Sequence, residues 1–123
     1  VPDEDDSLIF LTGGFMNVKS YEQDGVMVVQ VIGEINISTS PELRKLFEKE
    51  KNKKIVIDFE KVAYIDSSGL ATLVEVLKRT KTQGGSLGLA AMSDKIKSLF
   101  EITKLDKLFS IFPSQKDAVS GAQ

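Results

Sequence analysis

Residues 26–32, Val-Met-Val-Val-Gln-Val-Ile, form a run that is apolar on both faces of any strand it would make. A strand with one wet face alternates apolar and polar residues, whereas a strand covered on both faces reads as a nearly continuous apolar run. The run therefore predicts a central strand in a sheet that carries packed helices. The turn residues Gln23-Asp24-Gly25 fold it back onto a shorter strand predicted at Val18–Tyr21.

After this pair of strands, helix and strand patterns alternate to the end of the chain. The spacing of apolar residues predicts helices at 41–51, from Leu70 to about Gln83, after the N-cap Ser93, and at 117–122. Strands are predicted at 54–59, 86–91 and 108–112. Thr39-Ser40-Pro41-Glu42 has the pattern of a capping box that would begin the first helix. This order predicts an α/β fold with a mixed, mostly parallel β-sheet, helices packed on it and right-handed crossovers.

The length of 123 residues and the 41% hydrophobic content suffice for one well-packed domain. We expect this domain to span residues 16–119, followed by a tail at 120–123. We interpret residues 1–15 as an N-terminal extension that is disordered, or derived from expression with Met16 as the natural start, or native.

The chain contains no Cys and no His, so it has no thiolate, no imidazole base and none of the usual soft-metal ligands. We therefore expect no metal site, no cofactor and no enzymatic activity. The formal net charge of −2 argues against direct binding of nucleic acid. The basic run at 49–54 is interpreted as a solvated helix end and loop.

No apolar stretch approaches the roughly 18–20 residues that cross a bilayer. The early apolar run at 8–11 follows Asp3-Glu4-Asp5-Asp6, whereas a secretory segment carries positive charge at that place. We expect a cytoplasmic protein with no membrane partner.

Two loops follow predicted parallel strands, at 33–40 and 61–69. Loops that leave the carboxyl ends of such strands gather at one edge of the sheet, next to helix N-termini. In the second loop, Asp66-Ser67-Ser68-Gly69 places Ser67 at or just before the start of a helix. A helix N-terminus tolerates a phosphate on this hydroxyl, which would add about 1.5 to 2 negative charges to the surface. Alternatively, Asp66 or Ser67 is only an N-cap.

Two other chemical interpretations of this motif stay open. A serine hydrolase would need a base to take the Ser67 proton, and the chain has neither His nor a Gly-x-Ser-x-Gly elbow. A receiver-type domain would use Asp66 as a phosphoaspartate, and the neighbouring loop offers Glu34 and Asn36 toward a metal.

Five segments of the chain together carry a recognisable family pattern. They are Gly33-Glu34-Ile35-Asn36, Ile55-Val56-Ile57-Asp58-Phe59, Ile65-Asp66-Ser67-Ser68-Gly69-Leu70, Gly84-Gly85, and Ile96-Lys97-Ser98-Leu99-Phe100-Glu101-Ile102 with Leu105. With them the chain resembles the anti-sigma factor antagonists, the bacterial members of the STAS domain family. The likeness covers roughly residues 16–119 and implies a single STAS-like domain.

The resemblance implies a partner-switching protein rather than a catalyst. The unphosphorylated protein would bind an anti-sigma factor that is itself a serine/threonine kinase, and so release the sigma factor. Phosphorylation of the first serine of the motif, here Ser67, would weaken that binding, and a metal-dependent serine phosphatase would restore it. The implied switch surface comprises seven residues: Asn36, Ser38, Thr39, Asp66, Ser67, Ser68 and Gly69.

Asn36 departs from the family pattern, in which many members carry Asp after Gly-Glu-Ile or Gly-Glu-Leu. The amide keeps the hydrogen-bonding shape but removes a charge near Ser67, so we expect altered recognition by the kinase. The alternative to the switch is a STAS scaffold subunit of a larger complex, of the stress-signalling or lipid-transport type. In such a scaffold Ser67 would only cap a helix.

Overall fold

The computed structural model describes residues 7–10, 16–50 and 52–122. Within this part of the chain, one sheet contains β1 (Ser7–Phe10), β2 (Met16–Gln23), β3 (Val26–Ile35), β4 (Lys54–Ile65), β5 (Ser86–Ala90) and β6 (Ser110–Phe112). The helices are α1 (Ser40–Lys49), α2 (Ser67–Thr82), α3 (Asp94–Ile102) and α4 (Gln115–Ala122), with a short 3₁₀ helix at Leu105–Lys107.

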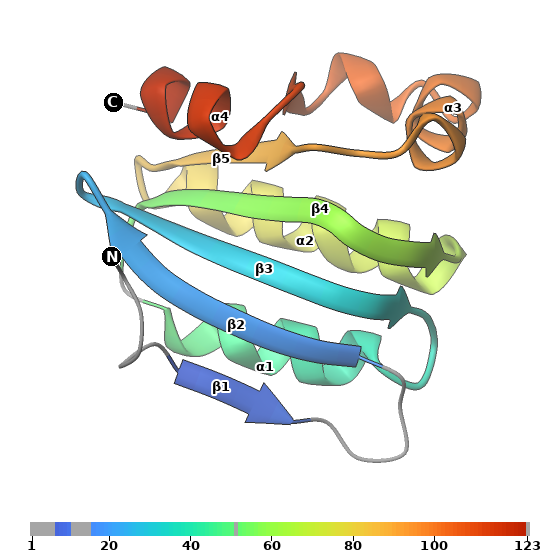
Figure 1. Cartoon of the computed structure of the whole chain (residues 1–123), viewed down its shortest axis with the longest axis horizontal. Coiled ribbons are helices and arrows are strands. Elements are labelled where there is room, and N and C mark those ends of the chain that lie inside the picture. Colours follow the sequence, from blue (N-terminus) through green and yellow to red (C-terminus); the bar gives the residue numbers. More distant parts are fainter. Residues whose placement is uncertain (1–6, 11–15, 51, 123) are drawn as a thin grey trace.

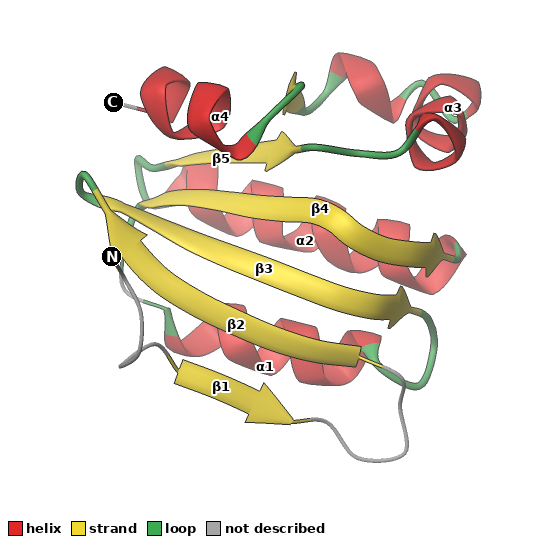
Figure 2. Ribbon diagram, viewed as in Figure 1, coloured by secondary structure: helices red, strands yellow, loops and turns green. Residues whose placement is uncertain are grey.

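The six strands lie side by side in the same order as in the sequence (Figures 1 and 2). β1, β2 and β3 pair antiparallel, whereas β3, β4, β5 and β6 pair parallel. Each parallel connection passes through a helix, because parallel strands need a long crossover. The mixed, mostly parallel α/β sheet predicted from the sequence is therefore confirmed.

The central strand β3 is covered on both faces, as its apolar run predicted. Val29 and Val31 belong to the larger core cluster, which also contains the inner residues of α1, α2 and α3. Val26 and Val28 belong to a smaller cluster that Ala118 and Val119 of α4 cover. In Figure 1, α1 and α2 lie behind the sheet and α4 lies in front of it.

A buried carboxylate helps to hold α4 on its face of the sheet. Asp58 of β4 is 4% exposed, and its Oδ2 accepts a hydrogen bond of 2.8 Å from Gln115 Nε2 at the start of α4. Tyr21 of β2 donates its hydroxyl to Gln115 Oε1, and Gln30 of β3 donates to the same Asp58 oxygen at 3.3 Å. Three strands are thus tied to one helix through polar contacts that satisfy the buried groups.

The N-terminal segment contributes more structure than the sequence predicted, whereas the helix predicted at 117–122 is confirmed as α4 (Gln115–Ala122). Residues 7–10, inside the segment interpreted as an extension, form β1 and pair with β2. The rest of that segment, 1–6 and 11–15, lies outside the described residues. α4 continues to Ala122, so residues 120–122 of the expected tail are helical. Four residues are too few for strand alternation to identify β1 from sequence.

β4 is a single strand of 12 residues, whereas the sequence predicted a strand that ends at Phe59. Its pairing with β3 changes register twice: Gln30 lies opposite Asp58, Ile32 opposite Lys61, and Glu34 opposite Tyr64. The extra residues of β4 at each change form bulges, which bend a strand and interrupt its apolar alternation. The bend is visible in Figure 1. The second half of β4 therefore does not read as a strand in the sequence.

β4 also extends far beyond its other neighbour. β5 pairs only with the first part of β4, from Lys54 opposite Ser86 to Asp58 opposite Ala90. Beyond this point no described strand pairs with β4 on that side, and Ile96 and Phe100 of α3 enter the larger core.

Gly69 lets α2 start directly against the end of β3. A Cβ at this position would lie 2.7 Å from the carbonyl oxygen of Ile35 and 2.7 Å from Cγ1 of Ile65. Since the carbonyl oxygen of Ile35 is a backbone atom, moving it away from an added Cβ would cost considerable free energy. The glycine thus fixes how closely the first turn of α2 approaches the sheet.

Three phenylalanine rings fasten α3 to the sheet. Phe100 of α3 meets Phe59 of β4 edge-to-face, with ring centroids 6.4 Å apart, and meets Phe109 at 5.7 Å in a similar arrangement. Phe100 is fully buried. Aromatic pairs of this geometry add about 0.5–1.5 kcal/mol to the energy of their burial.

We predict that Gly69→Ala lowers the free energy of unfolding by about 1–3 kcal/mol, because overpacking against a fixed backbone atom is costly. Urea unfolding followed by circular dichroism measures this loss. Ser68→Ala, in the same turn, is the control and should change stability by less than about 0.5 kcal/mol. Equal stability of Gly69→Ala and the wild type would contradict the close approach of α2 to β3.

We predict that Phe100→Ala lowers the free energy of unfolding by about 3–5 kcal/mol, the usual cost of emptying a buried aromatic site. The control is Leu108→Ala, because Leu108 is 52% exposed and its truncation removes little buried surface. A loss below about 1 kcal/mol for Phe100→Ala would show that the ring does not hold α3 in place.

Candidate functional site

The loops that follow β3 and β4 meet at the carboxyl edge of the sheet, as predicted. The backbone N–H of Asp66 donates to the carbonyl of Ile35 at 3.1 Å. In return, the N–H of Ile37 donates to Asp66 Oδ2 at 3.1 Å. These two hydrogen bonds join the end of β3 and the loop at 36–39 to the start of α2.

Asp66 is the N-cap of α2. Its backbone is extended (φ −106°, ψ −174°), and its Oδ1 accepts a hydrogen bond of 2.9 Å from the N–H of Gly69. Both carboxylate oxygens therefore accept backbone N–H groups, one from the helix and one from the facing loop. The negative charge also suits the positive end of the helix dipole. A carboxylate engaged in this way is poorly suited to be the phosphoacceptor of a receiver-type domain.

Ser67 is the first residue of α2 and is exposed to solvent. Because Asp66 provides the cap, the interpretation of Ser67 as the N-cap is wrong. Its hydroxyl makes no hydrogen bond to another residue in the described part of the chain, whereas the next two residues, Ser68 and Gly69, are half-buried and buried. The hydroxyl of Ser67 is thus accessible at the helix N-terminus, and it does not cap the helix.

The loop at 36–39 is shaped by its own polar side chains. Asn36 Oδ1 accepts hydrogen bonds from the N–H groups of Ser38, at 2.9 Å, and Thr39, at 3.1 Å. The buried Thr39 Oγ1 accepts from the N–H of Asn36 at 2.8 Å and donates to the carbonyl of Glu34 at 2.9 Å. Hydrogen bonds between residues at most five positions apart in the sequence therefore hold the conformation of this loop.

The predicted capping box at the start of α1 is wrong. Thr39 occupies the N-cap position, but its side chain makes no capping hydrogen bond, and its backbone has φ −101° and ψ −21°. The reason is that Thr39 Oγ1 is already engaged with Asn36 and Glu34. Pro41 lies in the first turn as predicted, where its missing N–H costs nothing.

The amide of Asn36 makes one contact that an aspartate could not make. Its Nδ2 donates to Glu34 Oε1 at 3.2 Å, whereas a carboxylate at this place would face Glu34 with like charge. The contacts of Oδ1 to Ser38 and Thr39 need only an acceptor, which Asp would also provide. The replacement of Asp by Asn at this position therefore adds a hydrogen bond to Glu34 and leaves the contacts within the loop unchanged.

Two large apolar side chains stand exposed beside Ser67. Ile37, next to Asn36 in the loop, is 73% exposed, and Tyr64, two residues before Asp66, is 46% exposed. Neither was singled out from the sequence, although an isoleucine among the polar residues of a loop was the available signal. Of the seven predicted residues, Thr39 and Gly69 are buried and shape the site from within, whereas the other five reach the surface. These five lie together with exposed apolar side chains, which favour a protein partner.

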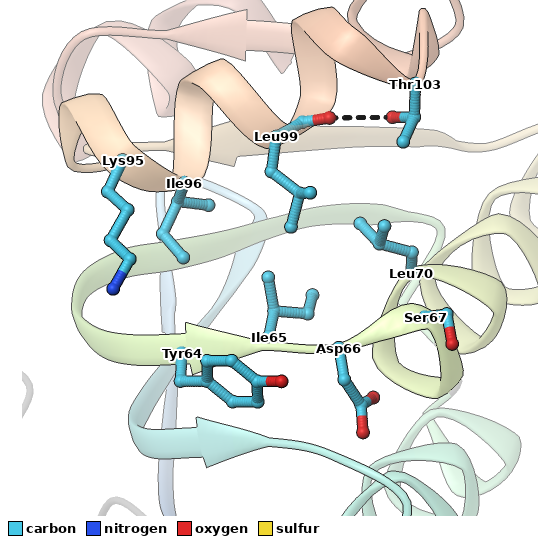
Figure 3. A pocket seen from close by; sticks show the side chains of 9 residues that line it. All are labelled: Tyr64, Ile65, Asp66, Ser67, Leu70, Lys95, Ile96, Leu99 and Thr103. Carbon is cyan, nitrogen blue, oxygen red and sulfur yellow. Dashed lines mark hydrogen bonds between the residues drawn. The ribbon is translucent and has the colours of Figure 1, made fainter.

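An open cavity of about 540 Å³ lies between the end of β4, the start of α2, and α3 (Figure 3). We call it the α2–α3 groove. Figure 3 shows Ser67 at one end, Lys95 at the other, and the side chains of Ile65, Leu70, Ile96 and Leu99 between them. Its lining residues are Tyr64, Ile65, Asp66, Ser67, Leu70, Lys95, Ile96, Leu99 and Thr103. Ile96 belongs to the buried core and Leu99 is half-buried, and their spacing in the sequence does not distinguish a core from a groove.

Among the residues that the structure describes, no three His, Cys, Asp or Glu side chains come together in a way that would hold a metal ion. None of the helices in the described part of the chain has the length and apolar character that a membrane crossing requires.

Comparison with known proteins agrees with this geometry. Residues 17–118 match the STAS domain. The anti-sigma-B factor antagonist of Bacillus subtilis is 34% identical over 106 residues, which cover 85% of this chain and 95% of the relative. The solved structure of an anti-sigma factor antagonist from Mycobacterium paratuberculosis has a TM-score of 0.79 and 28% identity, and covers 87% of this chain and 93% of its own.

A more distant structure shares the fold. The phosphorylated form of SpoIIAA, a cell fate determinant of Bacillus, has a TM-score of 0.65 at 15% identity and covers 96% of this chain and 99% of its own. The family match, the relative and the fold agree. The chain therefore belongs to the STAS domain family and is related to its anti-sigma factor antagonists.

Proposed function

We propose that this protein is an anti-sigma factor antagonist whose binding is switched at Ser67. The unphosphorylated form binds an anti-sigma factor that is a serine/threonine kinase, and so frees the sigma factor. Phosphorylation of Ser67 by that kinase ends the binding, and a metal-dependent serine phosphatase restores it. The observation that carries the proposal is the exposed Ser67 hydroxyl, which stands at the N-terminus of α2 on a surface shared with Ile37 and Tyr64.

The local electrostatics suit a phosphate at this place. The first turn of α2 offers backbone N–H groups and the positive end of the helix dipole, both of which stabilise an anion. Since the hydroxyl takes no part in the cap, its modification leaves the hydrogen bonds of Asp66 to Gly69 and Ile37 in place. The phosphate would therefore change the surface charge without unfolding the site.

The partner's surface would meet this new charge directly. A phosphoserine adds about 1.5 to 2 negative charges next to the carboxylate of Asp66 and beside the exposed Ile37 and Tyr64. An interface formed over apolar side chains loses affinity when an unpaired charge must be desolvated within it. SpoIIAA, a protein of the same fold, has a phosphorylated form, which supports control by phosphorylation.

In this proposal Ser67 is a substrate of the kinase, and its phosphorylated form is a substrate of the phosphatase. The chain has no His, so no imidazole can take the Ser67 proton, and the kinase and the phosphatase supply the catalytic groups. We accordingly propose a cytoplasmic binding protein that is not an enzyme and contacts neither nucleic acid nor a membrane.

We predict opposite behaviour for two Ser67 variants with the purified cognate kinase-type anti-sigma factor. Ser67→Ala should bind as tightly as the unphosphorylated wild type and accept no phosphate. Ser67→Asp should bind at least about tenfold more weakly, because it places a permanent charge in the interface. Isothermal titration calorimetry measures the dissociation constants, and mass spectrometry locates the phosphate.

Ser120→Asp is the matched control, because Ser120 is an exposed serine on α4, on the other face of the sheet. It should bind like the wild type. If the wild type, Ser67→Asp and Ser67→Ala all bound equally and Ser67 never carried phosphate, the switch would be refuted. A stable complex under those conditions would identify the scaffold subunit instead.

A further inference from the structure

The α2–α3 groove is an apolar recess that the fold itself does not fill. Its floor and walls include Ile96, 3% exposed, Leu70, 8% exposed, and the half-buried Leu99. Tyr64 flanks it with a ring that is 46% exposed. A recess of about 540 Å³ falls within the range of protein pockets that take a ligand group. The groove therefore offers burial to an apolar side chain from outside the molecule.

The charges at the rim favour an acidic neighbour for that apolar side chain. Lys95 is the one cation among the residues that line the groove, and it is exposed. The carboxylate of Asp66, the one anion there, has both oxygens engaged with the N–H groups of Gly69 and Ile37. The N-terminus of α2 adds its own positive dipole. A partner carboxylate thus finds its opposite charge in the ammonium group of Lys95, whereas the other end of the groove carries the positive end of α2 together with the Asp66 carboxylate that caps it.

The groove and the proposed switch share one wall. Ser67 lies at the end of the groove opposite Lys95 (Figure 3). A phosphate on Ser67 would replace the positive helix end by about 1.5 to 2 negative charges. This charge at the far end of the groove would oppose the approach of an acidic partner segment and would leave the apolar contact in the groove unsupported.

We propose that the α2–α3 groove receives an apolar side chain of the anti-sigma factor kinase, flanked by a carboxylate that pairs with Lys95. The inference rests on the proposed function and deepens it. The groove supplies a large share of the affinity, while Ser67 at its end supplies the control. Residues of the groove then determine how tightly the partner binds, whereas Ser67 determines whether it binds, and each can be mutated without the other.

The test measures dissociation constants for the purified cognate kinase in a Ser67→Ala background, so that no phosphate forms during the titration. Leu99→Asn should weaken binding about tenfold, because a polar amide replaces the apolar wall. Leu99→Met, which keeps the apolar character, should stay within about threefold of the background. Leu108→Asn is the control for an exposed leucine outside the groove and should leave the dissociation constant unchanged.

The charge at the rim is tested by Lys95→Glu, with Lys97→Glu as the control on an exposed lysine of the same helix that does not line the groove. Lys95→Glu should weaken binding about tenfold at low salt, and added salt should recover part of the loss. Lys97→Glu should have less than a threefold effect. Thermal unfolding of each variant verifies that it is folded at the temperature of the titration.

The outcomes separate the two proposals. If Leu99→Asn and Lys95→Glu bind like the background while wild-type Ser67 is phosphorylated, the groove proposal is wrong and the proposed function stands. If Lys95→Glu weakens binding and Leu99→Asn does not, the partner contacts the rim of the groove through charge alone, and docking of an apolar side chain in the groove is refuted. If the protein with Ser67 intact neither binds the kinase nor accepts phosphate from it, the proposed function fails, and the groove proposal fails with it.

Discussion

The carboxylate of Asp66 is the contact on which the candidate site depends. One oxygen accepts the N–H of Gly69 and begins α2, while the other accepts the N–H of Ile37 and holds the facing loop. Without this double acceptor, the first turn of α2 and the loop at 36–39 would lose the contact that fixes their separation. A helix cap costs about 1 kcal/mol when it is removed, so a single side chain both stabilises the fold and aligns the surface. The hydroxyl of Ser67 is left accessible because its neighbour performs the capping.

Much of the scaffold was predictable, because it follows from local patterns. The two-sided apolar run of β3 predicted a central strand, and the helix predicted at 41–51 is confirmed as α1, with Leu43 and Phe47 in the core. Ser93 was predicted as an N-cap, and its Oγ accepts from the N–H of Ile96 at 3.2 Å. The start of α2 near Ser67 followed from the change between strand and helix periodicity. Each of these features is encoded within a few neighbouring residues.

The features that the sequence did not reveal depend on which of several possible contacts the folded chain makes. The second half of β4 was hidden because its two bulges break the alternation by which a strand is recognised. The side chain of Thr39 was assigned to a cap, although a carbonyl in the preceding strand competes for the same hydroxyl. The groove was hidden as well, since Leu99 has the spacing of a core residue and only the position of α3 leaves it half open.

The difference in length between β4, with 12 residues, and β5, with five, has an evolutionary consequence. Because β5 stops beside Asp58, the chain from Ala91 to Ser93 sets where α3 stands relative to the end of β4. An insertion or deletion in these three residues would change the shape of the recess without altering any hydrogen bond of Asp66. The recess can therefore change shape while Asp66 and Ser67 keep their places. In the proposed function, recognition of the partner and control by phosphate would then vary independently of each other.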